Sequence, residues 1–252
     1  MRLPNLKELR TYQNIGKVLL DLPKPYVSKL KVIGDYDTSQ SQMEAIIGVC
    51  PHLEELSLED PEKKSLILLE ELRHLKKLKI SQVFPDNIRL RTLTLTTLQL
   101  NNSIVNSDDL CLTMENLILV SCQLRGFQES RFRNLRMLEL IDCDVEKSQI
   151  LPLLYYCDLI QRLALSNEIN LTDKDLKDLC DKQKLKYLEE LWLTLAKHLT
   201  IDSVILLMNH CDRLIELGTL NGWDVDNVEV NYLRCLVRLS NMKLNFLYFQ
   251  CF

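Results

Sequence analysis

The sequence contains little glycine and proline, and it has neither long apolar runs nor an excess of one charge. With 6 glycines and 7 prolines among 252 residues, a long flexible linker is not expected. No run of 18 apolar residues is present, so we expect no transmembrane helix, and the N-terminus lacks the apolar segment of a signal peptide. The 31 basic and 35 acidic residues are interleaved, which argues against nucleic-acid and membrane partners.

Cysteine pairs of the form Cys-x-x-Cys are also missing. The nine cysteines are odd in number, and most of them stand where the surrounding pattern has apolar residues. Cysteines used as small apolar side chains fit a reducing compartment better than a disulfide framework does. We therefore expect this protein in the cytoplasm or the nucleus.

Sequence signatures of enzymes are absent as well. There is no Gly-x-Ser-x-Gly, no glycine-rich phosphate loop and no His-Glu-x-x-His, and the four histidines are scattered. Their spacing matches no known metal site. The paired acids Asp108–Asp109 and Glu189–Glu190 are typical of surface charge rather than of a general acid and base. The sequence predicts a protein that is not an enzyme and that has no catalytic residues, cofactor or metal.

Residues 132–143 carry the clearest pattern that is present. From Leu135 the chain reads Leu-x-x-Leu-x-Leu-x-x-Cys, which ends at Cys143. Leu138 and Leu140 are two residues apart, so on a short strand both point to the same buried face. Cys143 is expected to turn inward after the strand, where a small side chain can face a bent backbone. One such unit cannot bury its own apolar edge and needs copies on both sides.

Such copies recur along nearly the whole chain, at steps of 21, 26, 22, 20, 19, 21, 25, 28, 26 and 25 residues. A register that begins at Leu90 competes with the one at Leu95. The period is that of leucine-rich repeats. We therefore predict an α/β fold of about eleven repeats, a single leucine-rich-repeat solenoid over residues 1–252. It is expected to be a curved horseshoe with a parallel β-sheet on the concave side and helices and 3-10 turns on the convex side. The eleven copies begin at Leu6, Val27, Leu53, Leu75, Leu95, Met114, Leu135, Ile160, Leu188, Leu214 and Leu239.

Apolar residues at helical spacing predict helices where the repeats are long. They fall at residues 39–50, 62–74 and 145–157, after a capping box at 172–175, and after Thr200. Pro152 predicts a break or distortion in the third of them. Repeats between residues 82 and 131 are too short for full helices, so a 3-10 turn or a loop is expected there.

The repeats resemble those of F-box proteins with leucine-rich repeats. The resemblance rests on Cys-x-x-Leu-x-x-Leu-x-Leu joined to Leu-Thr-Asp-x-x-Leu-x-x-Leu-Cys at 171–180. It implies substrate recognition for a cullin-RING (SCF-type) ubiquitin ligase. The F-box itself is not seen: Leu3-Pro4 is like its opening dipeptide, but residues 5–9 continue as a repeat strand. The chain thus begins inside a repeat, and a ligase adaptor would bind a segment beyond residues 1–252. The alternative is a stand-alone scaffold or inhibitor that binds one protein partner.

Residues between the buried leucines are predicted to face the concave surface, where solenoids usually bind partners. On the N-terminal strands they alternate in sign, with Lys29, Lys31 and Ile33 beside Glu55, Ser57 and Glu59 and then Lys77, Lys79 and Ser81, which favours pairing across strands. On later strands they are apolar with a few charges, as a protein-binding patch requires. Either an error of register or a cover formed by the tail at residues 246–249 would remove this patch. The predicted partner-binding residues are Asn116, Ile118, Val120, Met137, Glu139, Ile141, Arg162, Glu190 and Trp192.

Overall fold

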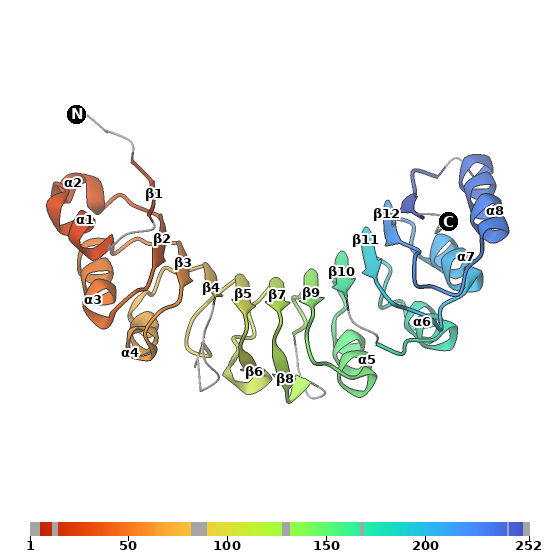
Figure 1. Ribbon diagram of the computed structural model, residues 1–252, viewed down its shortest axis with the longest axis horizontal. Coiled ribbons are helices and arrows are strands. Elements are labelled where there is room, and N and C mark those ends of the chain that lie inside the picture. The colour runs from red at the N-terminus through yellow and green to blue at the C-terminus, as the bar shows by residue number, and fades with distance from the viewer. Residues whose placement is uncertain are drawn as a thin grey trace. The chain divides into compact units, whose positions relative to one another are not determined.

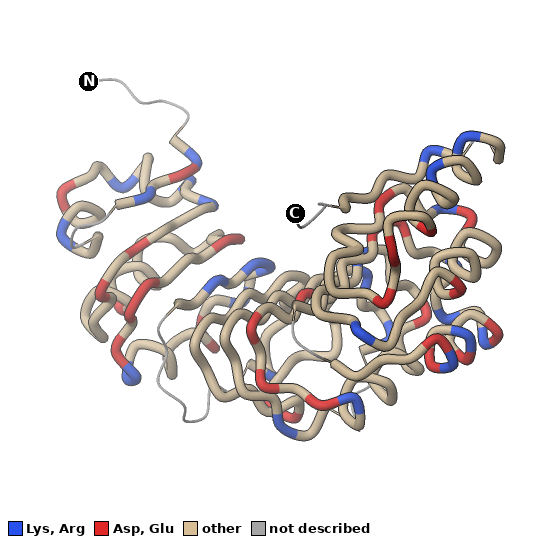
Figure 2. The backbone as a smooth tube through the Cα atoms, turned by 45° about the vertical axis from the view of Figure 1, so that its right-hand side comes forward, with Lys and Arg blue, Asp and Glu red and all other residues tan. Residues whose placement is uncertain are grey.

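The computed structural model describes residues 6–11, 15–81, 90–127, 132–166, 169–240 and 242–248. Leu3 and Pro4 lie outside these ranges. The chain divides into two compact units, Met1–Asn116 and Leu117–Phe252, and each is described by itself. That residues 1–252 form a single domain stays a prediction. In both units, lysine and arginine are mixed with aspartate and glutamate along the backbone (Figure 2).

The first unit is a parallel sheet whose described strands follow the order β1–β2–β3–β4–β5. Helices α1 to α4 lie on one side of it (Figure 1). Its elements are β1 (Glu8–Arg10), α1 (Ile15–Asp21), α2 (Lys24–Val27), β2 (Val32–Tyr36), α3 (Gln40–Val49), β3 (Glu55–Glu59), α4 (Lys63–Ile67), the 3-10 helix η1 (Leu68–Glu71), β4 (Lys77–Ser81), β5 (Thr97–Asn101), β6 (Ile104–Asn106) and the 3-10 helix η2 (Ser107–Asp109).

The second unit repeats this plan, with the strand order β7–β9–β10–β11–β12–β13 and parallel pairing from β9 to β13. Helices α5 to α8 lie on one side of the sheet (Figure 1). Its elements are β7 (Asn116–Val120), β8 (Gln123–Arg125), β9 (Met137–Ile141), α5 (Lys147–Tyr156), β10 (Arg162–Leu165), α6 (Asp173–Asp181), β11 (Glu190–Leu193), α7 (Ile201–His210), β12 (Glu216–Thr219), α8 (Asn227–Leu239) and β13 (Asn245–Leu247).

The predicted alternation of buried and half-buried residues is present in most strands. In the second unit Leu138 pairs in register with Leu163, Leu163 with Leu191, and Leu191 with Leu217, and all four are buried. A row of leucines at equal height thus forms the core under the sheet. In the first unit β5 begins at Thr97, so the register from Leu95 is confirmed over the one from Leu90.

The predicted register is wrong in two copies. In β2, Ile33 aligns with Leu9 and Leu56 and is fully buried, so it does not face the open side, and Lys29 and Lys31 precede the strand. The leucine spacing gave the wrong register for β2 because an aspartate, Asp35, occupies the next core position, opposite Leu58. In the last copy, Phe246 pairs with Leu217, whereas Leu239 ends α8 and is 84% exposed.

The turns after the strands explain the inward cysteines. The residue that follows each of β2, β3, β5, β7 and β9 has a left-handed backbone with φ of 51–52°. These residues are Asp37, Asp60, Asn102, Ser121 and Asp142, and short polar side chains tolerate that conformation best. Behind Asp142 the Cys143 thiol is buried and donates to the Leu119 carbonyl at 3.2 Å. Seven of the eight cysteines that the structure describes are buried, as expected for small apolar side chains.

The helices at 39–50, after 172–175 and after Thr200 are confirmed as α3, α6 and α7. The segment 62–74 holds the shorter α4 and η1. Pro152 lies inside α5 without ending it, so the helix is not broken there, and the alternative, a distortion, stays a prediction. Among described residues of 82–131, η2 is the 3-10 turn expected there. Strands β6 and β8 are short extended segments within the same range. No helix within the described ranges is long and apolar enough to cross a membrane.

Asp35 is a buried carboxyl at a leucine position. Burial raises its pKa, and hydrogen bonds from the Thr38 hydroxyl and two backbone N–H groups offset only part of this effect. Its Oδ1 is buried with no hydrogen-bond partner. The folded state therefore keeps Asp35 protonated up to a higher pH than the unfolded chain does. The protonated carboxyl contributes fully to the free energy of unfolding below the ordinary pKa of 3.8, and this contribution is lost as pH rises through the folded-state pKa.

We therefore expect Asp35→Asn to be more stable than the wild type at pH 7, by about 1–3 kcal/mol, because no charge is left desolvated. On acidification the wild type should gain stability relative to the variant. Urea unfolding of both proteins at pH 7 and pH 4.5 measures this difference. A difference that stays constant between the two pH values contradicts the assignment.

Candidate protein-binding surface

Eight of the nine predicted partner-binding residues belong to the second unit and lie on the open face of its sheet, which we define as the face opposite to helices α5 to α8 (Figure 1). In β7 and β9, buried leucines alternate with half-buried residues, and β10 and β11 repeat this pattern. Because side chains alternate across a strand, Ile118, Val120, Met137 and Ile141 share the open face with Trp192. Each is half-buried rather than exposed, since neighbouring strands bring further side chains against it.

Part of this face is a hollow of about 260 Å³. It brings together four predicted residues, Glu139, Ile141, Arg162 and Trp192. Ile118, Val120, Met137 and Glu190 lie on the same face but do not line the hollow. Three further residues of the open face line the hollow: Ala164, Ser166 and Thr194. They flank buried leucines, so the sequence predicts them on this face, but they are not among the predicted partner-binding residues.

Asn116 is not brought into this surface. It is the last residue of the first unit, where its side-chain amide donates to the Thr97 hydroxyl at 3.0 Å. This hydrogen bond links neighbouring strand positions and satisfies the amide within its own unit. Its role in partner binding stays a prediction.

Arg162 connects two acidic residues across three strands. Its Nε lies 2.7 Å from Glu139 Oε1 and its Nη1 lies 2.9 Å from Glu190 Oε2. Nε does not meet hydrogen-bond geometry, so its contact with Glu139 is an ion pair rather than an aligned hydrogen bond. Arg162 stands between the two carboxylates. The three charged groups form one row and leave a net charge of −1.

Trp192 has room on this face because its neighbours are small. Its Cα partner on β10 is Ala164. On β12, a Cβ atom added to Gly218 would come within 2.3 Å of the indole Cε3, so the ring lies directly against the backbone there. The sequence pattern did not single out Gly218, although a glycine at an open-face position is the signal that a large side chain covers it.

Two polar atoms at the hollow have no partner. Trp192 Nε1 and Thr194 Oγ1 are buried, and neither forms a hydrogen bond with the residues that the structure describes. A buried donor without an acceptor costs about 1–3 kcal/mol. The indole and the hydroxyl therefore retain hydrogen-bonding capacity that the chain itself does not use.

The C-terminal tail does not fold back over this patch in its described part. Residues Asn245–Leu247 form β13, which pairs with β12 and extends the sheet. The Tyr248 hydroxyl donates to the Val225 carbonyl at 3.4 Å. Phe249, the last residue of the predicted apolar tail, lies outside the described residues.

The charge row on β9, β10 and β11 yields a stability prediction. The side chains of Glu139 and Glu190 are only 14% and 29% exposed, so Arg162→Met leaves two carboxylates poorly solvated and close together. We expect a loss of about 1–3 kcal/mol in the free energy of unfolding, below the range for fully buried pairs because all three groups contact water. Adding Glu139→Gln and Glu190→Gln to Arg162→Met should restore most of it in thermal or urea unfolding. A triple variant that is less stable than the single variant contradicts this interpretation.

No metal centre is formed by the described residues, in which no group of three or more histidine, cysteine or acidic side chains is placed to hold an ion. The histidines are not all scattered, however. His52 and His74 lie one repeat apart, and their ring centroids are 5.6 Å from each other. In the first unit the predicted pairing of alternating charges is also present, with Lys77 Nζ 2.7 Å from Glu55 Oε1.

Comparisons with known proteins support the fold. The chain is similar to an internalin (inlF) from Listeria monocytogenes strain 4b F2365, with a TM-score of 0.59 and 14% identity over 91% of this chain and 69% of that one. A chain of the yeast Rad7 and Elc1 complex matches with a TM-score of 0.47 and 18% identity over 81% of this chain and 69% of that one, which does not establish a shared fold. No protein-family model and no curated protein matches the sequence. The α/β leucine-rich-repeat fold is thus confirmed.

Proposed function

We propose that this chain recognises a protein partner through the open face of β7, β9, β10 and β11, as a substrate-recognition module of a cullin-RING (SCF-type) ubiquitin ligase. The observation that carries the binding role is the hollow beside Trp192, where an indole and a guanidinium share a partly buried site. Tryptophan and arginine are the residues most often found at the energetic centre of protein interfaces.

The geometry favours a partner side chain that is apolar with a polar tip. Ile141, Ala164 and Trp192 supply apolar walls to the hollow. A slight rotation of the indole would let a partner carbonyl accept from Nε1, which has no acceptor within the chain. Satisfying that donor on binding recovers free energy that the unbound protein lacks.

The ligase assignment rests on the resemblance of the repeats at 171–180 to those of F-box proteins. The adaptor would bind a segment beyond residues 1–252, and the protein would act in the cytoplasm or the nucleus. The alternative is a stand-alone scaffold or inhibitor that holds one protein partner through the same surface. Both functions are non-enzymatic, and they differ in whether ligase subunits accompany the partner.

Purification of the tagged full gene product from its own cells, followed by mass spectrometry, tests the proposal. We expect a cullin and its adaptor together with at least one further protein, and we expect Trp192→Ala to remove the further protein alone. A partner retained without cullin or adaptor supports the stand-alone module. Ligase subunits that disappear together with the partner in Trp192→Ala contradict separate adaptor and substrate sites.

A further inference from the structure

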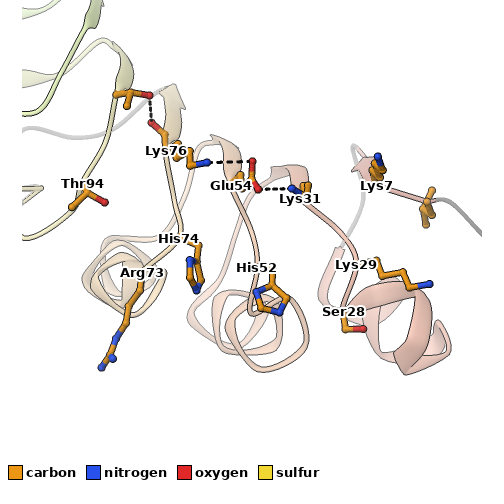
Figure 3. Close-up of a pocket in the computed structure, with 12 residues that line it drawn as sticks. Lys7, Ser28, Lys29, Lys31, His52, Glu54, Arg73, His74, Lys76 and Thr94 are labelled. Carbon is orange, nitrogen blue, oxygen red and sulfur yellow. Dashed lines mark hydrogen bonds and ion pairs between the residues drawn. The ribbon is translucent and has the colours of Figure 1, made fainter.

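A second hollow lies in the first unit, at the edge of the sheet where its strands begin. It has a volume of about 680 Å³, and residues that precede β1 to β5 line it (Figure 3). Five of them are cations and one is an acid: Lys7, Lys29, Lys31, Arg73, Lys76 and Glu54. We call this hollow the basic groove. Its charge is opposite to that of the whole chain, which has a formal net charge of −4.

Most of this positive charge is not neutralised by the chain. Glu54 lies between Lys31 and Lys76, with Nζ–Oε distances of 2.5 and 3.8 Å. Lys7, Lys29 and Arg73 are exposed and pair with no acidic side chain among the residues that the structure describes. One carboxylate therefore pairs with two of the five cations, and an anion that enters the groove can pair with the other three.

The repeat places these groups in two rows. Lys7, Lys31, Glu54 and Lys76 stand directly before their strands, and Lys29, Arg73 and the His52–His74 ring pair stand two or three residues earlier (Figure 3). The two imidazole rings are tilted by 52° to each other and line the hollow. The hollow is therefore an elongated channel that follows the strand starts.

We propose that the basic groove binds an extended acidic segment of a protein partner. Neighbouring strands are about 4.8 Å apart, so the starts of five strands span about 19 Å, or about six residues of an extended chain. Cations stand at the starts of β1, β2 and β4, while Glu54 stands at that of β3. Two strand spacings, about 10 Å, equal about three residues of an extended chain. Acidic side chains three residues apart can therefore pair with the cations on either side of Glu54, whereas an unbroken acidic run would place a carboxylate against Glu54 and be repelled.

This placement favours an acidic peptide over a nucleic acid. A phosphodiester chain has a negative charge at every residue, so it cannot avoid the carboxylate at the centre of the groove. The overall negative charge of the chain also repels a long polyanion. The proposal is independent of the open-face function, because all of its residues belong to the first unit.

Fluorescence anisotropy with the full chain tests this inference. The probe is a fluorescein-labelled ten-residue peptide with glutamate at every third position and serine or glycine between. We expect binding at low salt that weakens as salt rises, and at least about tenfold weaker binding by Lys29→Glu/Arg73→Glu. The matched control is Lys174→Glu/Lys177→Glu on α6, two exposed lysines with the same charge change, which should stay within about twofold of the wild type. Equal loss in both double variants, or no binding by the wild type at low salt, overturns the proposal.

Two further measurements keep the test decisive if a double variant does not fold. Glu54→Gln removes the single acid of the groove, so the spaced peptide should bind about threefold or more tightly, which damage to the fold cannot produce; unchanged or weaker binding counts against the groove. A peptide of the same composition with adjacent glutamates should bind less tightly than the spaced one, and equal or tighter binding overturns the assigned spacing. A ten-nucleotide oligothymidylate that binds more tightly than either peptide assigns the groove to nucleic acid instead.

Discussion

Replacing Leu138 with alanine is expected to lower the free energy of unfolding by about 2–5 kcal/mol, the range for removing a leucine from a tightly packed core. Leu138 is completely buried and stands in register with Leu163 on β10. The cavity left behind would open between repeats, and each repeat is stabilised mainly by its neighbours. Urea unfolding followed by circular dichroism measures the change.

Met137→Ala is the matched control, because Met137 is adjacent on the same strand but faces the open side. It is half-buried, so its loss should cost about 1 kcal/mol or less at about 25 cal/mol per Å² of apolar surface. If Met137→Ala destabilises the protein as much as Leu138→Ala, the two faces of β9 have been assigned the wrong way round.

The strands could be predicted from the sequence because each depends on a short local pattern. Leucines two and three residues apart fixed which side chains of β9 and β10 are buried, and the structure agrees. The pattern failed at β2, where Asp35 takes a core position by hydrogen bonding to Thr38, and at β13, where Phe246 stands in place of a leucine. In both places a residue outside the leucine pattern stands in register with a buried leucine of the neighbouring strand.

Contacts within the candidate surfaces could not be predicted in the same way. They join residues about one repeat apart, as between Arg162 and Glu190 or between His52 and His74. Which side chains meet depends on the lengths of the intervening segments, and these vary from repeat to repeat. The sequence could thus assign Arg162 and Glu139 to one face, but it could not show that they neutralise each other.

Replacing Trp192 with alanine is expected to weaken binding of the open-face partner by about 2 kcal/mol or more, which is about 30-fold in Kd. The indole is half-buried on the open face rather than in the core, so the free energy of unfolding should change much less than in Leu138→Ala. Isothermal titration calorimetry with the purified partner gives the first quantity, and urea unfolding gives the second. A Trp192→Ala protein that does not fold would show that the indole is part of the core.

Gly218→Ala tests whether the partner needs the indole in its present position, because this variant moves the ring without removing it. The added methyl group would lie 2.3 Å from Cε3 of the ring, so Trp192 must move away from β12 although the chain still contains it. If the partner recognises the indole where it now lies, Gly218→Ala should weaken binding nearly as much as Trp192→Ala. Full affinity in Gly218→Ala together with lost affinity in Trp192→Ala would mean that the partner recognises the indole in a different position, and that the hollow beside the ring as it now lies is not the recognised site.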